Sequence, residues 1–442
     1  MRRGEKVKEG VRSFRTRVLA SLFIFSLLFF LPLPLSRADT LVSTETREGR
    51  LAVFDDVWET IRARYYDASF NGLDWEAERE RFRPQAAEAK TSAEFYEVLR
   101  RMLGALRDSH TRVYAPEEKF DWQHPRVVTT GISIREVDGQ PVVVLVDPDS
   151  DAKRAGVRVG DIITSVDDEP ALELFTKRLK EVTGASTPHS RRARAMATLL
   201  AGVPSSTVKV GWRASDGRER VATLRREWRD RTAKLNIESL RGGFYVVRFD
   251  AFTRAVTYDL MRALQNRLRR ARGIVLDLRN NGGGDSEAMT DIVSIFLEPR
   301  TPLGRFTDRT GRVVVEPETR RAMVLAADAI ASFDGSLAVL TSERTASAAE
   351  IFVASIKEAR RAVLIGTGTC GCVLAIRRRH LLPDGGELDI SEMDYRTSLG
   401  QRLEGAGVSP DETITLSLSD LRAARDRAIE RALERLKLQS GN

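Results

Sequence analysis

Cysteine is scarce in this sequence: Cys370 and Cys372 are the only two among 442 residues. Two cysteines exclude the disulfide framework that holds small secreted domains together. A bridge between residues i and i+2 is possible but strained. A metal site would need histidine or carboxylate partners, and none lies nearby in the sequence. We therefore expect two reduced thiols in or near a strand, and no bound metal.

Long apolar runs are also rare, and the one present lies near the N-terminus. A basic stretch precedes apolar residues 18–31, and Pro32 and Pro34 end the run. Ser36-Arg37-Ala38 then has the small-x-small pattern of a signal cleavage site. The run is short for a membrane span, which needs about 20 residues. We predict that residues 1–38 are a cleaved export signal, with a retained anchor as the alternative, and expect a periplasmic or extracellular protein.

Excess charge of one sign is missing from the rest of the chain. The net charge is +8, but residues 1–38 hold eight Lys or Arg and only two Glu. The remaining residues contain 63 basic and 61 acidic side chains. Nothing in this balance favours nucleic-acid binding.

Residues 39–120 are predicted to form a helical N-terminal domain. Apolar residues recur with helical spacing, and Thr91-Ser92-Ala93-Glu94 is a capping box. The last helix is expected to end near Asp108-Ser109-His110-Thr111. His110 is one of only four histidines, and a capping or solvated role is its simplest interpretation on local grounds.

Residues 127–230 alternate short strands with glycine-containing turns, as in a small β-rich module. The stretch Gly160-Asp161-Ile162-Ile163 and the strands around it resemble a PDZ domain. Such domains bind a peptide C-terminus on backbone N–H groups and add the peptide as an edge strand. The resemblance places this role at Gly131, Ile132, Ser133 and Ile134. Residues 187–201 are interpreted as a basic helical insert, beginning near a solvated His189.

Residues 231–416 alternate strands and helices, which predicts a largely parallel sheet. Ligand sites in such sheets collect at the carboxyl ends of strands. Gly282, Gly283 and Gly284 follow one such end, and Ser347 follows another. The glycines let backbone N–H groups approach a ligand closely. Residues 417–442 are predicted to form a C-terminal helix, over residues 421–436, and a tail.

Ser347 lies on a turn of small residues directly before a helix. The hydroxyl of such a serine can face a pocket, beside the unpaired N–H groups of the first helical turn. A nucleophile and its oxyanion hole need this geometry. An ordinary helix N-cap has the same local pattern, so the local sequence leaves both interpretations open.

Three motifs in order, with a PDZ-like module upstream, resemble the C-terminal processing peptidases, and more closely their tricorn-like branch. The motifs are Leu276-Asp277-Leu278-Arg279-Asn280-Asn281-Gly282-Gly283-Gly284, Thr345-Ala346-Ser347-Ala348-Ala349-Glu350 and Glu404-Gly405-Ala406-Gly407-Val408-Ser409-Pro410-Asp411. The resemblance implies a multidomain α+β protein. It would have a helical N-terminal domain, a PDZ-like domain and a crotonase-like (ClpP-like) α/β catalytic core. It further implies Ser347 as the nucleophile, with oxyanion donors at Gly283 and Ala348, and no cofactor.

The departure from the family pattern concerns the base. Most of these peptidases pair the serine with a lysine, and Cys372 occupies the lysine position here, with Ile376 where a glutamine usually follows. A thiol cannot serve as an amine base. The tricorn-like branch instead implies His110 as the base, with Ser109 and Glu404 as orienting groups. An imidazole is suited to accept a serine proton near neutral pH.

The sequence therefore predicts an exported serine endopeptidase that acts on unfolded or C-terminally exposed polypeptides. One alternative is a non-catalytic peptide-binding protein that lost its chemistry together with the lysine. A further alternative gives Cys372 a nucleophilic or redox role. The expected partner is a polypeptide substrate or peptide C-terminus, and a membrane only if the N-terminal segment is retained.

Overall fold

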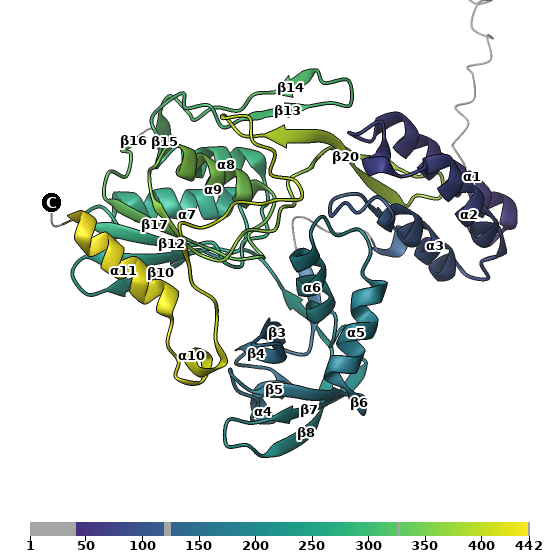
Figure 1. Cartoon of the computed structure of the whole chain (residues 1–442), viewed down its shortest axis with the longest axis horizontal. Coiled ribbons are helices and arrows are strands. Elements are labelled where there is room, and N and C mark those ends of the chain that lie inside the picture. The colour runs from purple at the N-terminus through teal and green to yellow at the C-terminus, as the bar shows by residue number, and fades with distance from the viewer. Residues whose placement is uncertain (1–40, 119–124, 326–327, 441–442) are drawn as a thin grey trace, which may run out of the picture. The chain divides into compact units, whose positions relative to one another are not determined.

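The computed structural model describes residues 41–118, 125–325 and 328–440, so the predicted export signal lies outside the described residues. None of the helices in the described part is long and apolar enough to cross a membrane. Helices and sheets are mixed throughout, in the multidomain α+β arrangement that the sequence predicts (Figure 1).

The N-terminal part is helical. Its helices are α1 (Arg47–Arg64), α2 (Trp75–Glu88) and α3 (Ser92–Gly104). Each begins after a residue whose side chain accepts a backbone N–H of the first turn, namely Thr46, Asp74 or Thr91. Strand β1 (Arg112–Tyr114) follows and pairs antiparallel with β20 (Glu387–Arg396). This pairing fixes the Ser109-His110 turn, just before β1, against the core.

The second part is a β-rich module. Its strands pair in the order β3 (Ile132–Val137), β4 (Gln140–Val146), β5 (Ile162–Val166), β7 (Thr207–Arg213), β8 (Glu219–Arg225), with β6 (Glu169–Pro170) beside β5. The helices are α4 (Asp151–Arg154), α5 (Ala171–Glu181) and α6 (Pro188–Ala197). Outside this sheet, β2 (Arg126–Thr129) pairs with β9 (Glu227–Asp230).

Helix α6 lies beside β3 and is integral to this module (Figure 1). Ala195 and Met196, on α6, are buried in the same hydrophobic core as Ile132 and Ile134 of β3. The interpretation of residues 187–201 as a helical insert stays a prediction, and its helix shares the core of the module. In the described sheet, β3 has β4 as its only strand neighbour, so its other edge is free. Residues of β3 and α6 line one groove.

The third part of the chain is built on a largely parallel sheet, as predicted. Its order is β10 (Asn236–Leu240), β11 (Phe244–Arg248), β12 (Gly273–Asp277), β17 (Ser336–Thr341), β18 (Val363–Gly366), β21 (Glu412–Thr413), and only the β10–β11 pair is antiparallel. Helices α7 (Arg254–Gln265), α8 (Ser286–Val293) and α9 (Ala348–Glu358) cover one face, and α11 (Arg427–Ser440) covers the other (Figure 1). Successive strand residues point to opposite faces, so Leu276 packs with the first group and Val275 with α11.

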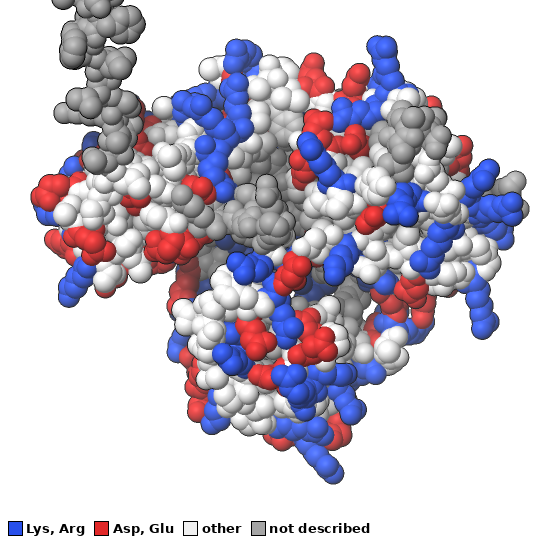
Figure 2. Space-filling model, turned by 180° about the vertical axis from the view of Figure 1, so that it is seen from behind, with Lys and Arg blue, Asp and Glu red and all other residues white. Residues whose placement is uncertain are grey.

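A second, antiparallel sheet and a small ribbon complete the core. The strands of the sheet are β1, β13 (Arg305–Thr307), β14 (Val313–Val315), β19 (Ala375–Leu381) and β20. The ribbon is β15 (Met323–Leu325) with β16 (Asp328–Ile330). Lys and Arg are interspersed with Asp and Glu on the face drawn in Figure 2.

The tail contains two helices where one is predicted. Helix α10 (Leu418–Arg422) and α11 are separated by a turn in which Ala424 has φ +51°. Leu418 and Leu421 pack against Val142 and Ile162 of the β-rich module, and the Leu418 N–H donates to Asp138. The C-terminal segment thus contacts both the module and the core sheet.

Candidate active site

Ser347 has an unusual backbone conformation. It lies between β17 and α9 with φ 57° and ψ −126°. The N-cap residues Thr46, Thr91 and Thr253 all have the ordinary extended conformation. A non-glycine residue in a left-handed region is strained, and such strain persists only where the surroundings impose it. Ser347 therefore differs from an ordinary cap and resembles a serine on a sharp strand-to-helix elbow.

Glu350 holds this turn in place. Its carboxylate is fully buried and accepts four hydrogen bonds: from the N–H groups of Ser347 (3.2 Å), Gly371 (2.7 Å) and Cys372 (2.8 Å), and from the Thr369 hydroxyl (2.6 Å). Burial raises the pKa of Glu350 to about 7, against the effect of these donors. The sequence analysis assigned no role to Glu350, although its place three residues after Ser347 is the signal of a capping box.

Cys370 and Cys372 form a disulfide, so the expectation of two reduced thiols is wrong for this structure. Both residues are buried, and the Cys372 carbonyl accepts the Ser347 N–H at 2.9 Å. The loop that carries the two cysteines therefore contacts the serine turn. Its sulfur atoms are bonded to each other, and a bonded sulfur has no thiolate for nucleophilic attack.

The glycine turn lies directly against the serine turn. A Cβ atom placed on Gly283 would come within 2.7 Å of the Ser347 Cβ and 3.0 Å of the Ala348 nitrogen, so only glycine fits. The Gly283 N–H donates to the buried side-chain oxygen of Asn281 at 2.9 Å. The Ala348 N–H, at the first position of α9, has no acceptor among the described residues. The two predicted oxyanion donors therefore lie close together. Among the described residues, the Ala348 N–H has no acceptor, whereas the Gly283 N–H is bonded to Asn281.

Ser109 and Glu404 meet through a residue that the sequence analysis missed. The Ser109 hydroxyl accepts both the Ser186 N–H and the Ser186 hydroxyl, each at 3.0 Å. The Ser186 hydroxyl also contacts the Glu404 carboxylate, which further accepts the N–H groups of Val373 (2.7 Å) and Leu374 (3.2 Å). Burial raises the pKa of Glu404 to about 7, against the effect of Ser186.

His110 lies beside this network, half-buried, with its ring Nδ1 enclosed. Its backbone N–H donates to Asp108 at 2.8 Å, and its ring Nδ1 has no hydrogen-bond partner among the described residues. Burial lowers the pKa of His110 to about 4, although the nearby Asp108 opposes this shift. Within the described part of the chain, no hydrogen bond joins His110 to Ser347.

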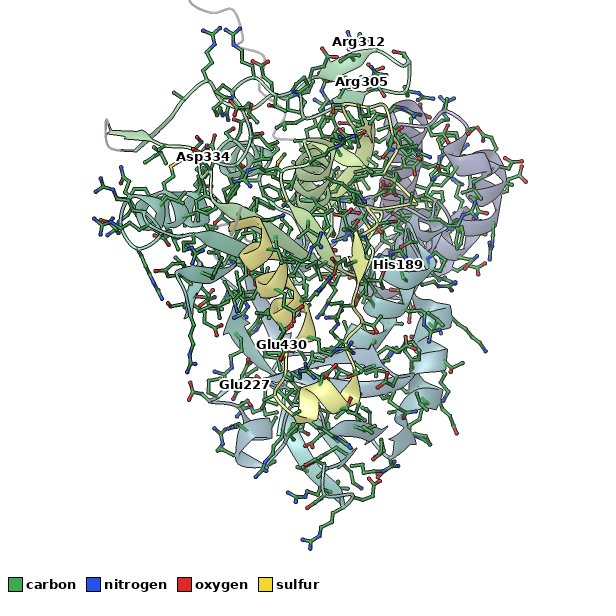
Figure 3. All side chains as sticks on the ribbon, turned by 60° about the vertical axis from the view of Figure 1, so that its left-hand side comes forward. His189, Glu227, Arg305, Arg312, Asp334 and Glu430 are labelled. Atoms are coloured by element: carbon green, nitrogen blue, oxygen red, sulfur yellow. A yellow bond between two sulfur atoms is a disulfide. The ribbon has the colours of Figure 1, made fainter. Side chains whose placement is uncertain are left out.

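The start of α6 connects the two halves of the site. The Thr187 hydroxyl donates to the Cys370 carbonyl at 2.8 Å, and His189 Nε2 lies 2.9 Å from the Thr369 carbonyl oxygen. His189, labelled in Figure 3, is exposed, as expected, and also makes this contact. A short path of contacts therefore runs from Ser109 through Ser186 and Thr187 to the disulfide loop and Ser347.

Comparison with known proteins is consistent with this architecture. A model of peptidase family S41 matches residues 244–414, one of the tricorn protease C1 domain matches residues 47–104, and one of the PDZ domain matches residues 142–182. The carboxyl-terminal-processing protease of Picosynechococcus sp. is 26% identical over 370 residues, which cover 81% of each chain. Carboxyl-terminal-processing peptidase 2 of Arabidopsis thaliana is 27% identical over 388 residues, covering 83% of this chain and 69% of its own.

The chain belongs to the C-terminal processing peptidase family. It is a serine-type peptidase with a PDZ domain. Among solved structures, the photosystem II D1 C-terminal processing protease has a TM-score of 0.54 at 25% identity, covering 84% of this chain and 93% of its own. Mature CPAF complexed with lactacystin has a TM-score of 0.66 at 13% identity, covering 89% and 98%, which shows a shared fold.

The PDZ domain of this peptidase presents the four predicted peptide-binding residues along β3. Gly131 has φ +82°, and its N–H donates to the Thr129 hydroxyl at 3.0 Å. Ile132 and Ile134 are buried in the domain core, and Ser133 is half-buried. The groove beside β3 opens into a cavity at Ile134 and continues along the C-terminal half of the strand.

Only one group of side chains in the described structure could gather around a metal ion, and its members are already bonded to other groups of the protein. Ligand atoms of Glu350, Cys370 and Cys372 lie within 4.8 Å of one another. The two sulfur atoms are joined, and the carboxylate accepts four hydrogen bonds. These donors do not suit a metal in this state.

Proposed function

We propose that this peptidase is an exported serine endopeptidase that cleaves unfolded or C-terminally exposed polypeptides through an acyl-enzyme on Ser347. The observation that carries the proposal is the strained backbone of Ser347 beside the unpaired Ala348 N–H. A strained elbow exposes the hydroxyl, and the adjacent N–H suits the oxygen that becomes negative in the transition state. Export rests on the pattern of residues 1–38.

The base in this proposal is His110. The disulfide removes Cys372 as a proton acceptor, and Lys357 is engaged at the far end of α9, where its ammonium donates to the Ser409 carbonyl at 2.6 Å and lies 3.5 Å from Asp411. His110 is neutral near pH 7 and therefore able to accept a proton. Catalysis requires its ring to come within about 3 Å of the Ser347 hydroxyl in the substrate complex.

The proposed orienting group is the Glu404–Ser186–Ser109 network. It holds the residue directly before His110, so it acts on the base through the backbone rather than on the substrate. In the same proposal, Ala348 and Gly283 stabilise the oxyanion, and the Asn281 side chain must release or share the Gly283 N–H when the substrate oxygen arrives.

The reaction then follows the two-step course of acyl transfer. The Ser347 oxygen attacks the scissile carbonyl while His110 takes the hydroxyl proton. The carbon–nitrogen bond breaks as the imidazolium gives that proton to the leaving amine, which leaves an ester on Ser347. A water molecule, deprotonated by His110, attacks the ester, and the proton returns to Ser347 as the new carboxyl product departs.

A mass-spectrometric trapping experiment tests the proposal. The purified chain is treated with a fluorophosphonate, which modifies activated serines, and is then digested and sequenced. We expect the adduct on Ser347, and none in a Ser347→Ala variant. An unlabelled chain that still binds peptides would support the alternative of a non-catalytic peptide-binding protein. The absence of a hydrogen bond between His110 and Ser347 is the observation that keeps this alternative in view.

A further inference from the structure

A cavity of about 560 Å³ lies between the PDZ domain and the core. Its walls come from β3, α6, the turn before Ser347, the loop after β18 and the segment before α10. One border is the free edge of β3, where an extended polypeptide can add as a further strand. The cavity therefore offers backbone pairing on one side and side-chain contacts on the other.

Nearly every charged side chain that lines this cavity already has a partner. Arg135 pairs with Glu343, which links β3 to the turn before Ser347. Arg192 of α6 pairs with Glu136 through two hydrogen bonds. The Asp138 carboxylate accepts the N–H of Leu418 at 3.0 Å. Each of these side chains therefore has a partner within the protein; the two ion pairs carry no net charge, and Asp138 keeps its negative charge.

Arg344 is the exception. It lies three residues before Ser347, is partly buried, and its guanidinium has no hydrogen-bond or ion-pair partner among the described residues. The cations Arg135 and Arg231 lie near it, and Glu343 is its only opposing charge nearby. A desolvated, unpaired guanidinium is costly, and a carboxylate is the group that best complements it in geometry and charge.

We propose that this cavity is a carboxylate-binding subsite, in which Arg344 binds an acidic group of an extended polypeptide paired with the free edge of β3. The proposal rests on the proposed function in naming a class of substrate: acidic polypeptide segments. The carboxylate comes either from an Asp or Glu side chain or from the C-terminus. Both sources have the same chemistry at Arg344, and the experiment separates them.

The test measures peptide binding by fluorescence anisotropy, with the full chain carrying Ser347→Ala so that the peptide stays intact. Three labelled peptides are compared: one with a single Glu and a free C-terminus, its Glu→Gln counterpart, and its C-terminal amide. We expect at least tenfold weaker binding for the peptide that lacks the recognised carboxylate. Weaker binding of the Glu→Gln peptide would show that the cavity binds the Glu side chain. Weaker binding of the C-terminal amide would show that it binds the C-terminal carboxylate.

Variants of the protein then test whether the carboxylate of the peptide binds at Arg344. Arg344→Gln should abolish the preference, and Arg344→Glu should reverse it in favour of a peptide with Lys in place of Glu. Arg218→Gln removes the same charge from the exposed β7–β8 turn of the PDZ domain and should leave the preference unchanged. A misfolded variant would instead weaken binding of all peptides alike, and the reversal by Arg344→Glu cannot arise from misfolding.

Equal binding of all three peptides would overturn the proposal. It would also be overturned if the preference survived Arg344→Gln, because the carboxylate would then bind elsewhere, for example at Gly131. Since binding is measured on a chain without the Ser347 hydroxyl, a parent chain that failed to hydrolyse peptides would contradict the proposed function and leave this result standing.

Discussion

At the scale of single residues, His110 is a half-buried residue whose environment favours the neutral imidazole. Its pKa is lowered to about 4, mainly by burial. The unfolded chain has the ordinary value of about 6.5. The unfolded state therefore takes up the proton first, and the free energy of unfolding falls as the pH decreases from about 6.5 to about 4.

A urea titration at two pH values checks this prediction. Between pH 7 and pH 5 the parent should lose about 2 kcal/mol more stability than a His110→Leu variant, in which this group cannot titrate. Both chains share all other titrating groups, so the difference isolates His110. Equal losses in the two chains would show that His110 is not buried in its neutral form.

Ser186 is the residue whose contribution to the site is easiest to isolate. Burial raises the pKa of Glu404 to about 7, and the hydrogen bond from Ser186 opposes this rise. If the ionised carboxylate orients the Ser109-His110 turn, kcat/KM should rise with pH through a value near 7. His110 is already neutral there, and Glu350 also has a pKa of about 7, so a variant must assign this limb to Glu404.

The Ser186→Ala variant should shift that limb of the pH–rate profile upward and lower kcat at pH 7 by about tenfold, while KM changes little. Ser332→Ala, which removes an exposed hydroxyl, is the matched control. An unshifted profile in Ser186→Ala would remove Ser186 from the network, even if the variant were less stable.

At the scale of elements, the loop between β18 and β19 is held by four different groups. Glu350 and Glu404 accept its N–H groups, Thr187 donates to one of its carbonyls, and the disulfide joins two of its residues. Since the hydrogen bonds do not involve the sulfur atoms, they remain when the disulfide is removed.

A chain with both Cys370→Ser and Cys372→Ser should therefore hydrolyse an unfolded protein within a few-fold of the parent rate. The parent measured under oxidising conditions is the reference, and both are assayed at the same temperature. A loss of several orders of magnitude in this variant would give the cysteines a chemical role in the reaction.

The elements of the core could be predicted because their signals are local. The strand before Gly282 and the helix after Ser347 follow from apolar periodicity; the catalytic roles that the family resemblance implies for Ser347, Gly283 and Glu404 stay predictions. The Ser186 contact could not be predicted, because it joins residues 77 positions apart through polar side chains without any sequence pattern. The Cys370–Cys372 bond was missed because two cysteines at this spacing usually remain reduced, and the role of α6 because a basic helix outside the PDZ motif resembles an insertion.

At the scale of the whole molecule, the PDZ domain is joined to the rest of the chain at two places. The Arg135–Glu343 pair lies at the cavity, and α10 packs through Leu418 and Leu421 on the sheet face that carries Val142 and Ile162. The cavity is lined by Glu343, four residues before Ser347, and by α6, whose N-cap residue Thr187 donates to the disulfide loop.

Export is the other property of the whole chain, and N-terminal sequencing of the secreted or periplasmic protein checks it. The basic, apolar and small residues of the first 38 positions predict a mature chain that begins near Asp39. A mature protein that begins at Met1 and sediments with membranes would establish the retained anchor instead.

The central claim is that Ser347 and His110 act as one catalytic unit without a lysine. Its most direct test is kcat for digestion of an unfolded protein by the parent, Ser347→Ala and His110→Ala chains. The account predicts that both variants lose orders of magnitude in kcat, to comparable residual rates, because paired catalytic groups act together. A His110→Ala chain that digests as fast as the parent, beside an inactive Ser347→Ala chain, would contradict it.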